Sequence, residues 1–456
     1  MIGRSATVTI LLLSLAGLAG CHQPPAPPPV RPPTAGYWFD SFRARRQRLT
    51  RPEFLAGAAK VKLTPTRRGV RIAGHGVFRK HSRGVLDDLW GRVLYLDSGP
   101  QAVVLVSLDF IGWMYPRTQR IRARVTRRHP HSIIVAATHN HDGPDTEGIW
   151  GPGLLGMVPT RSGVDQRYLD RVERRVARAI LRAVARARPA RLYLGRFPVP
   201  EGLAVNLREP EDLPLVATVL RAADARDDST IGTVINWGNH AEALQDHNRW
   251  LSADWPGVMC REVDLALGGV TLFFSAPAGG MIEPANRPDD PEPQRLAFCR
   301  HLGGSLAAGA INLAIGGMES CDQPEILLAW QPVRFSLQPG STIALVFRLG
   351  LLEPRPLPAG RLLSEMELID LGKLQIATVP AELTPAVGRL LEARLTAPYH
   401  MLITLGLDHL GYVITHRQWA DARFEYERSM SLGPDTVDTL VEGIEGLTTT
   451  LRSARR

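Results

Sequence analysis

The sequence predicts an α/β fold in which a layered mixed sheet is flanked by helices. Short apolar segments rich in valine and isoleucine alternate with long amphipathic segments, and this alternation is typical of such folds. About 420 residues follow a proline-rich segment near the N-terminus, which is enough for one large domain or two smaller ones. The sequence contains no internal repeat.

Apolar runs bounded by turn residues predict the strands, and amphipathic periodicity predicts the helices. The expected strands are 102–108, 132–138, 191–197, 231–238, 270–275, 325–335, 363–369, 374–379 and 400–406. The expected helices are 115–128, 165–188, 255–267, 291–315, 382–396 and 434–452.

Residues 1–20 have the features of an export signal. A positive residue, Arg4, precedes an apolar run from Val8 to Leu18, which is too short to cross a bilayer as a mature helix. The sequence Leu-Ala-Gly-Cys ending at Cys21 has the form of the bacterial lipobox. We therefore expect cleavage before Cys21 and lipidation of that cysteine. An ordinary signal peptide followed by an incidental cysteine is the alternative.

A proline-rich tether at residues 21–36 is expected to separate Cys21 from one folded domain at 37–456. Residues 24–33 cannot form a helix or a sheet ladder, so they should adopt polyproline II and span roughly 30 Å. We expect the protein at the cell envelope as a membrane-anchored lipoprotein, periplasmic or at the outer membrane. His22 is not the aspartate that would favour retention at the inner membrane.

Arginine dominates the charge of the chain. The formal net charge is +9, from 54 lysines and arginines against 45 acidic residues. The arginines are scattered along the chain, so no nucleic-acid partner is expected, although a basic face would favour anionic lipid. Besides Cys21 the chain contains Cys260, Cys299 and Cys321, which allow one disulfide at most and show no CxxC spacing for a metal site.

The strongest local motif is a pair of histidines at the end of an apolar strand. His139-Asn140-His141-Asp142 follows this strand and leads into a Gly-Pro turn. Residues i and i+2 share one face of a strand, so His139 and His141 can point into one cleft at its carboxyl end. Ligand sites in α/β sheets favour that edge. Two surface histidines at a strand end are the alternative.

His240 comes just after another apolar strand, 231–237. Taken alone, a histidine in this position is more often structural than functional. Asp254 opens the helix that follows. It is either the cap of that helix or a residue that supports the site from behind.

Glu382 and Tyr412 also follow predicted strands. Glu382 comes after the strand 374–379, at the start of a predicted helix, where a carboxylate is favourable in any case. Tyr412 lies a few residues after the strand 400–406.

Together these residues suit a zinc site. Imidazoles from His139 and His240, the carboxylate of Glu382 and the phenolate of Tyr412 would give zinc a tetrahedral or five-coordinate site with room for water. Zinc would lower the pKa of that water and polarise a carbonyl oxygen. The metallo-β-lactamase motif HxHxDH does not fit, because Asp142 lies three residues after His139 instead of four. The eight regular βα units of a TIM-barrel amidohydrolase are not evident either.

The motifs resemble those of the neutral/alkaline ceramidase catalytic domain, in matching order from about Leu55 to Gly433. The run from His139 to Pro144 resembles the family's His-Thr-His-Ser-Gly-Pro. The resemblance implies the ceramidase catalytic-domain fold and zinc as the cofactor. It also implies that His139 binds the metal and that His141 contacts the substrate.

The resemblance assigns three further zinc ligands and one supporting residue. His240 matches the second zinc histidine, and the Val-Pro-Ala-Glu ending at Glu382 resembles the family's Val-Pro-Gly-Glu. Tyr412 lies in a segment that resembles the one carrying the ligand tyrosine. Asp254 ends a Ser-Ala-Asp run that is similar to the family's Ser-Ser-Asp, which implies a place near the substrate.

The family's serine loop, Gln-Ser-Asn-x-Gly-Asp, is altered in this chain. It corresponds to residues 274–280, where Ala276 or Pro277 takes the serine position, depending on the register. Ser275 takes the catalytic role if the loop shifts.

Two other substrate-facing segments match in part. Tyr426 and Glu427 resemble a Tyr-Glu pair of the family in which the tyrosine lies close to the substrate. An alignment without gaps would instead match that pair to Phe424 and Glu425. The family's Asn-Arg element becomes Asn206-Leu207-Arg208, which makes Arg208 a candidate substrate contact.

The resulting hypothesis is a zinc-dependent hydrolase that cleaves an N-acyl amide bond in a ceramide-like lipid or related acyl substrate. Metal-activated water would attack the bond, and His141 with Tyr426 would stabilise the developing oxyanion. The altered serine loop leaves one alternative, a ligand- or lipid-binding lipoprotein with the same fold and no turnover. The expected partners are the acyl-amide or lipid substrate and, through Cys21, the membrane.

Overall fold

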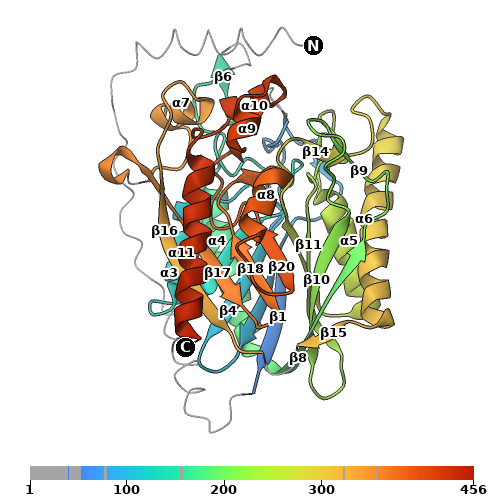
Figure 1. Ribbon diagram of the computed structural model, residues 1–456. Coiled ribbons are helices and arrows are strands. Elements are labelled where there is room, and N and C mark those ends of the chain that lie inside the picture. Colours follow the sequence, from blue (N-terminus) through green and yellow to red (C-terminus); the bar gives the residue numbers. More distant parts are fainter. Residues whose placement is uncertain are drawn as a thin grey trace.

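The computed structural model describes Asp40 and residues 53–75, 80–154, 158–321, 324–355 and 357–455 (Figure 1). The expected export signal, the lipidation site Cys21 and the tether lie outside these residues and stay predictions. Among the described helices, none has both the length and the apolar character needed to span a membrane. The three described cysteines, Cys260, Cys299 and Cys321, are buried and free.

A large mixed sheet forms the centre of the described fold. Its strands are β1 (Leu55–Lys62), β3 (Trp90–Asp97), β4 (Ala102–Leu108), β5 (Ile133–Ala137), β8 (Arg188–Pro198), β10 (Val216–Asp224), β11 (Thr230–Trp237), β13 (Val270–Ser275) and β15 (Glu319–Cys321). They lie in the order β13-β11-β10-β8-β1-β3-β4-β5, and β15 also pairs with β8. The pairs β4/β5 and β11/β13 are parallel, and the others are antiparallel.

A second mixed sheet packs beside the first. It contains β16 (Leu327–Phe335), β17 (Leu362–Asp370), β18 (Leu374–Thr378) and β20 (Tyr399–Ile403) in that order, with β18 and β20 parallel. Short strand pairs complete the loops. They are β2 (Gly84–Val85) with β12 (Trp250–Leu251), β6 (Gly153–Leu154) with β7 (Val158–Pro159), β9 (Ala204–Asn206) with β14 (Ile282–Pro284), and β19 (Glu382–Leu383) with β21 (Tyr412–Val413).

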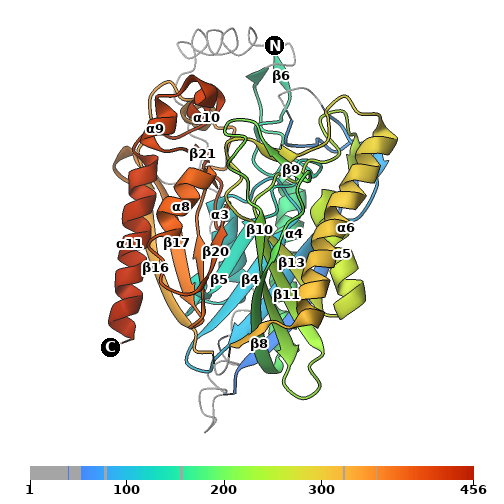
Figure 2. The same ribbon diagram turned by 45° about the vertical axis from the view of Figure 1, so that its right-hand side comes forward.

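Three pairs of helices cover the outer faces of the sheets (Figure 2). Helices α3 (Tyr115–Val125) and α4 (Gln166–Ala185) pack on β1, β3, β4 and β5. Helices α5 (Asp254–Leu267) and α6 (Glu292–Gly316) pack on β10, β11 and β13, and α8 (Pro385–Glu392) and α11 (Thr436–Ala454) on the second sheet. Shorter helices are α7 (Thr342–Arg348), α9 (His416–Trp419), α10 (Glu425–Ser429), η1 (Pro130–Ser132), η2 (Pro358–Gly360) and η3 (Ala422–Phe424).

The inner faces of both sheets share one apolar core. Leu94 and Leu105 of the large sheet pack in the same cluster as Ile376 and Ile403 of the second sheet, and all four are fully buried. Each such side chain stabilises the fold by about 1.5–3 kcal/mol relative to exposure. Because both sheets contribute to this core, their strand ends are held in fixed relative positions.

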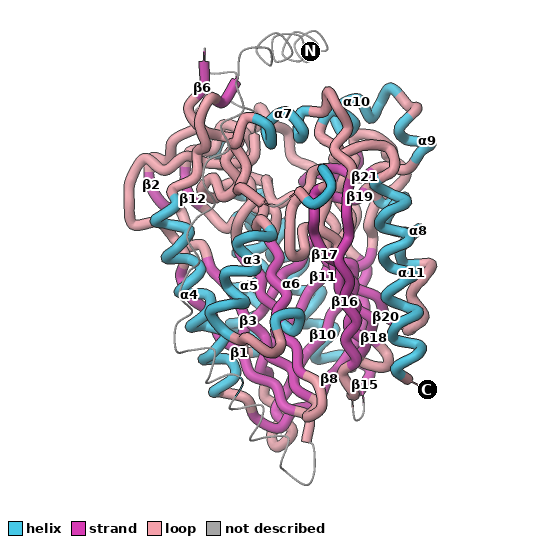
Figure 3. The backbone as a smooth tube through the Cα atoms, turned by 90° about the vertical axis from the view of Figure 1, so that its left-hand side faces the viewer, coloured by secondary structure: helices cyan, strands magenta, loops and turns pink. Residues whose placement is uncertain are grey.

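The large sheet curls so that strands from its two ends meet. Ser107 in β4 donates its hydroxyl hydrogen to the Phe273 carbonyl of β13 at 2.6 Å. After β20, the Leu407 amide donates to the Val135 carbonyl of β5 at 2.7 Å, and the Thr404 amide donates to Ser275 at the end of β13. The carboxyl ends of β5, β13 and β20 therefore gather at one end of the molecule, where β19, β21 and α10 also lie (Figure 3).

The structure confirms the predicted α/β class and the mixed sheet with flanking helices. Among the described elements, the sequence patterns miss β1, β3, β10 and β15 of the large sheet, the short paired strands, and the short helices α7, α9 and α10. The alanine-rich runs of β1 and β10 have weak strand propensity, which burial between neighbouring strands overrides. The helix expected over 382–396 is wrong at its start. It begins at Pro385 with Thr384 as its cap, because Glu382 and Leu383 are paired with β21.

Candidate metal centre

His139 lies in a sharp turn after β5. The Thr138 amide donates to the Leu108 carbonyl and the Asn140 amide to the Phe110 carbonyl, so the turn is fixed against the chain after β4. His139 itself has a φ of 61°, in the left-handed region that side chains rarely adopt. Such strain persists only where the surrounding structure enforces it, and it is frequent at functional sites.

The imidazole of His139 is oriented by a backbone carbonyl. Its Nδ1 atom lies 2.8 Å from the carbonyl oxygen of Ile111. A carbonyl can only accept, so Nδ1 carries the hydrogen and Nε2 keeps a free lone pair.

His240 is held in the same way from the other part of the sheet. Its Nδ1 atom lies 2.8 Å from the carbonyl oxygen of Ile282 in β14, and its amide donates to the same oxygen. Again the lone pair stays on Nε2. Histidine ligands of metals typically donate their second ring nitrogen to a carbonyl or carboxylate in this manner.

The loops after β5 and β11 are joined to one another. The His141 amide donates to the Ala241 carbonyl at 3.0 Å, and Asn140 and Ala241 form a parallel bridge. Ligand atoms of His139, His141 and His240 consequently all lie within 4.8 Å of one another, and all three residues are buried.

Glu382 completes this cluster from β19. Its Oε2 atom lies 3.1 Å from Nε2 of His139 and 3.4 Å from Nε2 of His240. Burial alone would raise the pKa of Glu382, but the neighbouring histidines lower it well below the usual range, so the carboxylate is ionised. Among the described residues, Oε2 has no hydrogen-bond partner although it is fully buried.

These residues fit a divalent metal ion. A buried carboxylate oxygen without a hydrogen bond is costly, and the Nε2 atoms of two imidazoles, which offer their lone pairs to a metal once deprotonated, face it. Two imidazoles and a carboxylate are a ligand set that zinc prefers. The pKa of His240 is raised to about 9 because Glu382 and other acids outweigh the effect of burial, and a bound cation would replace that proton.

Tyr412 lies directly beside Glu382. The two are register partners in the parallel pair β19/β21, and Tyr412 is buried. Burial and the nearby Glu382 raise the pKa of its hydroxyl well above the usual value. The ring of Tyr426, from α10, contacts that of Tyr412 with centroids 5.8 Å apart, and Tyr426 is about half exposed.

The sequence motifs miss two residues that orient Glu382. His409 places Nε2 at 2.9 Å from Oε1 of Glu382, and its Nδ1 atom contacts a carboxylate oxygen of Glu147. Both partners accept, so His409 is protonated. Its pKa is raised to about 10, because the two carboxylates outweigh burial. The available signal is that His409, like His139 and His240, closely follows a strand.

Ser275 and Asp254 make local contacts. The Ser275 hydroxyl, at the end of β13, donates to the Ala276 carbonyl at 3.1 Å. Asp254 accepts from the amides of Ala243, Leu244 and Trp255 at 2.7–3.0 Å. It is not the cap residue of α5, and it holds the loop that follows His240.

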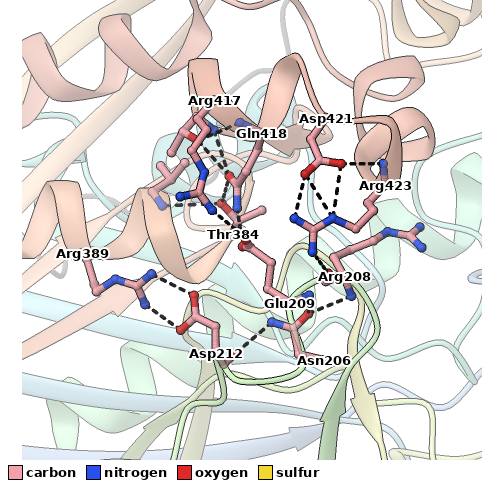
Figure 4. Close-up of polar contacts among 12 residues, drawn as sticks. Asn206, Arg208, Glu209, Asp212, Thr384, Arg389, Arg417, Gln418, Asp421 and Arg423 are labelled. Atoms are coloured by element: carbon pink, nitrogen blue, oxygen red, sulfur yellow. Dashed lines mark hydrogen bonds and ion pairs between the residues drawn. The ribbon is translucent and has the colours of Figure 1, made fainter.

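Arg208 and the loop after β9 belong to one polar network with the segment from Arg417 to Arg423 (Figure 4). The Nε atom of Arg208 donates to Oε1 of Glu427 at 2.8 Å, and Arg423 donates to the Arg208 carbonyl. Further contacts join the loop after β9 to the region from α8 to η3. They pair Asp212 with Arg389, and Glu209 with Arg417 and Gln418. Gln418 in turn accepts from Thr384, the cap of α8.

The fold and the cluster together define an α/β protein with a buried histidine and carboxylate centre suited to a metal ion. No family model matches the chain. The sequence is 22% identical over 265 residues to the neutral ceramidase of Pseudomonas aeruginosa, a match that covers 52% of this chain and 38% of that protein. The match thus spans well under half of the relative's length.

Solved structures show the fold over a longer range. The crystal structure of neutral ceramidase from Pseudomonas aeruginosa superimposes with a TM-score of 0.73 and 18% identity, over 88% of this chain and 75% of that chain. A structure of ceramidase complexed with C2 gives a TM-score of 0.71 and 18% identity, over 88% and 76%. The chain therefore has the fold of neutral ceramidase.

Proposed function

We propose that the chain is a zinc-dependent hydrolase of the neutral ceramidase family. It would cleave the N-acyl amide bond of a ceramide-like lipid or a related acyl substrate. The observation that carries the proposal is the buried Oε2 atom of Glu382, which has no hydrogen-bond partner and faces the Nε2 atoms of His139 and His240. The sequence match to a neutral ceramidase supplies the reaction class.

The metal would be held by His139, His240, Glu382 and Tyr412. When bound, zinc supplies a water molecule of lowered pKa and polarises a carbonyl oxygen. Ile111 and Ile282 orient the two imidazoles through their carbonyls.

The neighbouring residues would orient the substrate. His141 presents Nε2 at 3.4 Å from Nε2 of His139, close enough to donate to the oxygen of a scissile carbonyl beside the metal. Tyr426 stands at the exposed side of Tyr412, where it would contact the substrate and support the oxyanion. Arg208 would contact the polar part of the substrate. Ser275 lies within the altered loop, residues 274–280, and we assign the attack to water.

We further propose that the protein acts at the cell envelope, where lipidation of Cys21 would keep the active site near lipid substrates. A single acyl chain binds membranes only marginally, so a stable anchor would need more than one.

The test is metal content combined with hydrolysis of a fluorescent N-acylsphingosine by the full chain in detergent. We expect bound zinc and turnover in the wild type, and in His240→Ala we expect loss of turnover together with about one equivalent of zinc. His416→Ala is the matched control, because His416 is exposed and its ion-pair partner within the described part of the chain is the exposed Asp438. Zinc binding without hydrolysis of amide or ester substrates would favour the binding-protein alternative, and absence of zinc would overturn the proposal.

A further inference from the structure

A second group of buried ligands lies next to the candidate centre. It consists of His75, His141 and Glu242, whose ligand atoms all lie within 4.8 Å of one another. Oε2 of Glu242 is 3.1 Å from Nδ1 of His141 and 3.5 Å from Nδ1 of His75. We propose that this group binds a second divalent cation of the kind that accepts imidazole and carboxylate ligands, such as Zn²⁺, Mn²⁺ or Co²⁺.

Hydrogen bonding does not satisfy this group. Nδ1 of His141 is buried and lacks a hydrogen-bond partner among the described residues, although Oε2 of Glu242 lies 3.1 Å away. Within the same residues, Glu242 has no lysine or arginine at ion-pair distance, and its ion-pair partners are the two imidazoles. A buried carboxylate normally requires a paired charge. A cation at the point where these atoms converge would supply it.

The ligand set itself suits a cation. Two imidazoles and one carboxylate are groups that a divalent metal such as zinc accepts, and three protein ligands leave coordination positions open for water.

The backbone brings the three ligands together from separate segments. The Ala73 amide donates to the Gly143 carbonyl and the Asp145 amide to the Arg71 carbonyl, so the segment before His75 is paired with the turn after His141. Gly74 has a φ of 110°, and a Cβ there would lie 2.5 Å from Cβ of His141 and 2.7 Å from its Nδ1. Only glycine allows this approach.

Glu242 is fixed from another direction. The carboxylate of Asp254 accepts from the amides of Ala243 and Leu244, directly after Glu242. The amide of Gln245 also donates to the Glu242 carbonyl at 2.9 Å. A rigid carboxylate facing two rigid imidazoles is the pre-organisation that a metal site needs.

The second cation would determine the tautomer of His141. Coordination through Nδ1 leaves the hydrogen on Nε2, which lies 3.4 Å from Nε2 of His139 in the first centre. His141 then donates toward the substrate side of that centre. This consequence rests on the proposed function, whereas the cation site itself does not.

The test measures metal stoichiometry, so it does not depend on knowing the substrate. Full-length apoprotein in detergent is titrated with Co²⁺ and followed by visible absorption, and bound zinc is counted in parallel by mass spectrometry. We expect about two equivalents per chain in the wild type and about one in His75→Ala and in the isosteric Glu242→Gln. The control His416→Ala should keep the wild-type stoichiometry, and circular dichroism checks the fold of each variant.

His240→Ala separates the two proposals. If both centres exist, His240→Ala loses the first cation and keeps about one equivalent of bound metal. The double variant with Glu242→Gln then loses the remaining equivalent. A wild type that saturates at about one equivalent would overturn the second site. Two equivalents of bound metal in folded Glu242→Gln and folded His75→Ala would also overturn the second site. Failure to hydrolyse any acyl amide, with two cations bound, would contradict the proposed function and leave the second site standing.

Discussion

His409 donates to Glu382 from the side of the carboxylate opposite the histidine cluster, with Nε2 at 2.9 Å from Oε1. Glu147 holds the other ring nitrogen of His409, so the imidazole bridges two carboxylates that come from distant parts of the chain. Oε1 of Glu382 is thus occupied by a hydrogen bond, and Oε2 is left to face His139 and His240.

We predict that His409→Ala weakens zinc binding by about 10- to 100-fold, because outer partners that orient metal ligands contribute this much. Competition with a chromophoric chelator would measure the change, and His416→Ala should leave the affinity unaltered. Zinc affinity equal to that of the wild type in folded His409→Ala would show that Glu382 does not need this contact.

Gly112→Ala should disturb the same contact without removing a polar group. A Cβ at Gly112 would collide with Oε1 of Glu147 and lie 2.5 Å from Nδ1 of His409. We expect a loss of about 1–3 kcal/mol in the free energy of unfolding, measured in urea, together with weaker zinc binding.

The matched control for this substitution is Gly316→Ala. That glycine ends α6, and no atom lies within 4 Å of where a Cβ would be placed. Its stability should change by less than about 1 kcal/mol. If Gly112→Ala kept the wild-type zinc affinity, zinc binding would not need the contact between Glu147 and His409.

Substitutions of Tyr412 and Tyr426 should affect different properties: zinc affinity for Tyr412, and the kinetics of substrate hydrolysis for Tyr426. Tyr412→Phe removes a proposed ligand, so zinc affinity should fall by at least about tenfold while the buried ring still fills its space. Tyr426→Phe should keep the zinc affinity and raise KM or lower kcat for the acyl substrate, since Tyr426 is half exposed beside Tyr412. Equal zinc affinities in the two variants would exclude Tyr412 as a ligand.

Arg122 is predicted to be a large contributor to stability. Its guanidinium lies buried between Glu365 and Glu367, and Nε donates to the Ile133 carbonyl at 2.9 Å. Arg122→Met would remove the buried guanidinium that pairs with both glutamates, so the free energy of unfolding should fall by about 3–5 kcal/mol. The exposed Arg174 on α4 is the comparison, and Arg174→Met should change stability by less than about 0.5 kcal/mol. Similar values for both variants in urea denaturation would contradict this prediction.

The sequence predicts much of the fold because the central strands carry strong apolar signals. Strands β4, β11 and β13 lie where the apolar runs place them, within a residue or two. The sequence also indicates that polar residues after these strands gather at one end. The sequence does not predict how the site residues are arranged relative to one another. His139 and His141 meet through a left-handed turn beyond β5, and not through the alternation of a strand face.

The remaining site residues have no local signal strong enough to single them out. His409 and Glu147 are 262 positions apart, and His75 reaches His141 only because Gly74 packs against that imidazole. Such pairs depend on how the sheets close, which no local pattern encodes. The sequence pattern predicts a helix at Glu382. Its pairing with Tyr412 on two short strands instead depends on the tertiary structure.

The curled sheet determines when during folding the protein could bind the proposed metal. His139 follows one end of the sheet, His240 follows a strand near the other end, and Glu382 comes from the second sheet. A chain emerging during synthesis or export would therefore have no complete ligand set until its last third is in place and both sheets have closed. Metal uptake would then mark the end of folding and not its beginning, and a cation bound at that stage would lock the distant strand ends together.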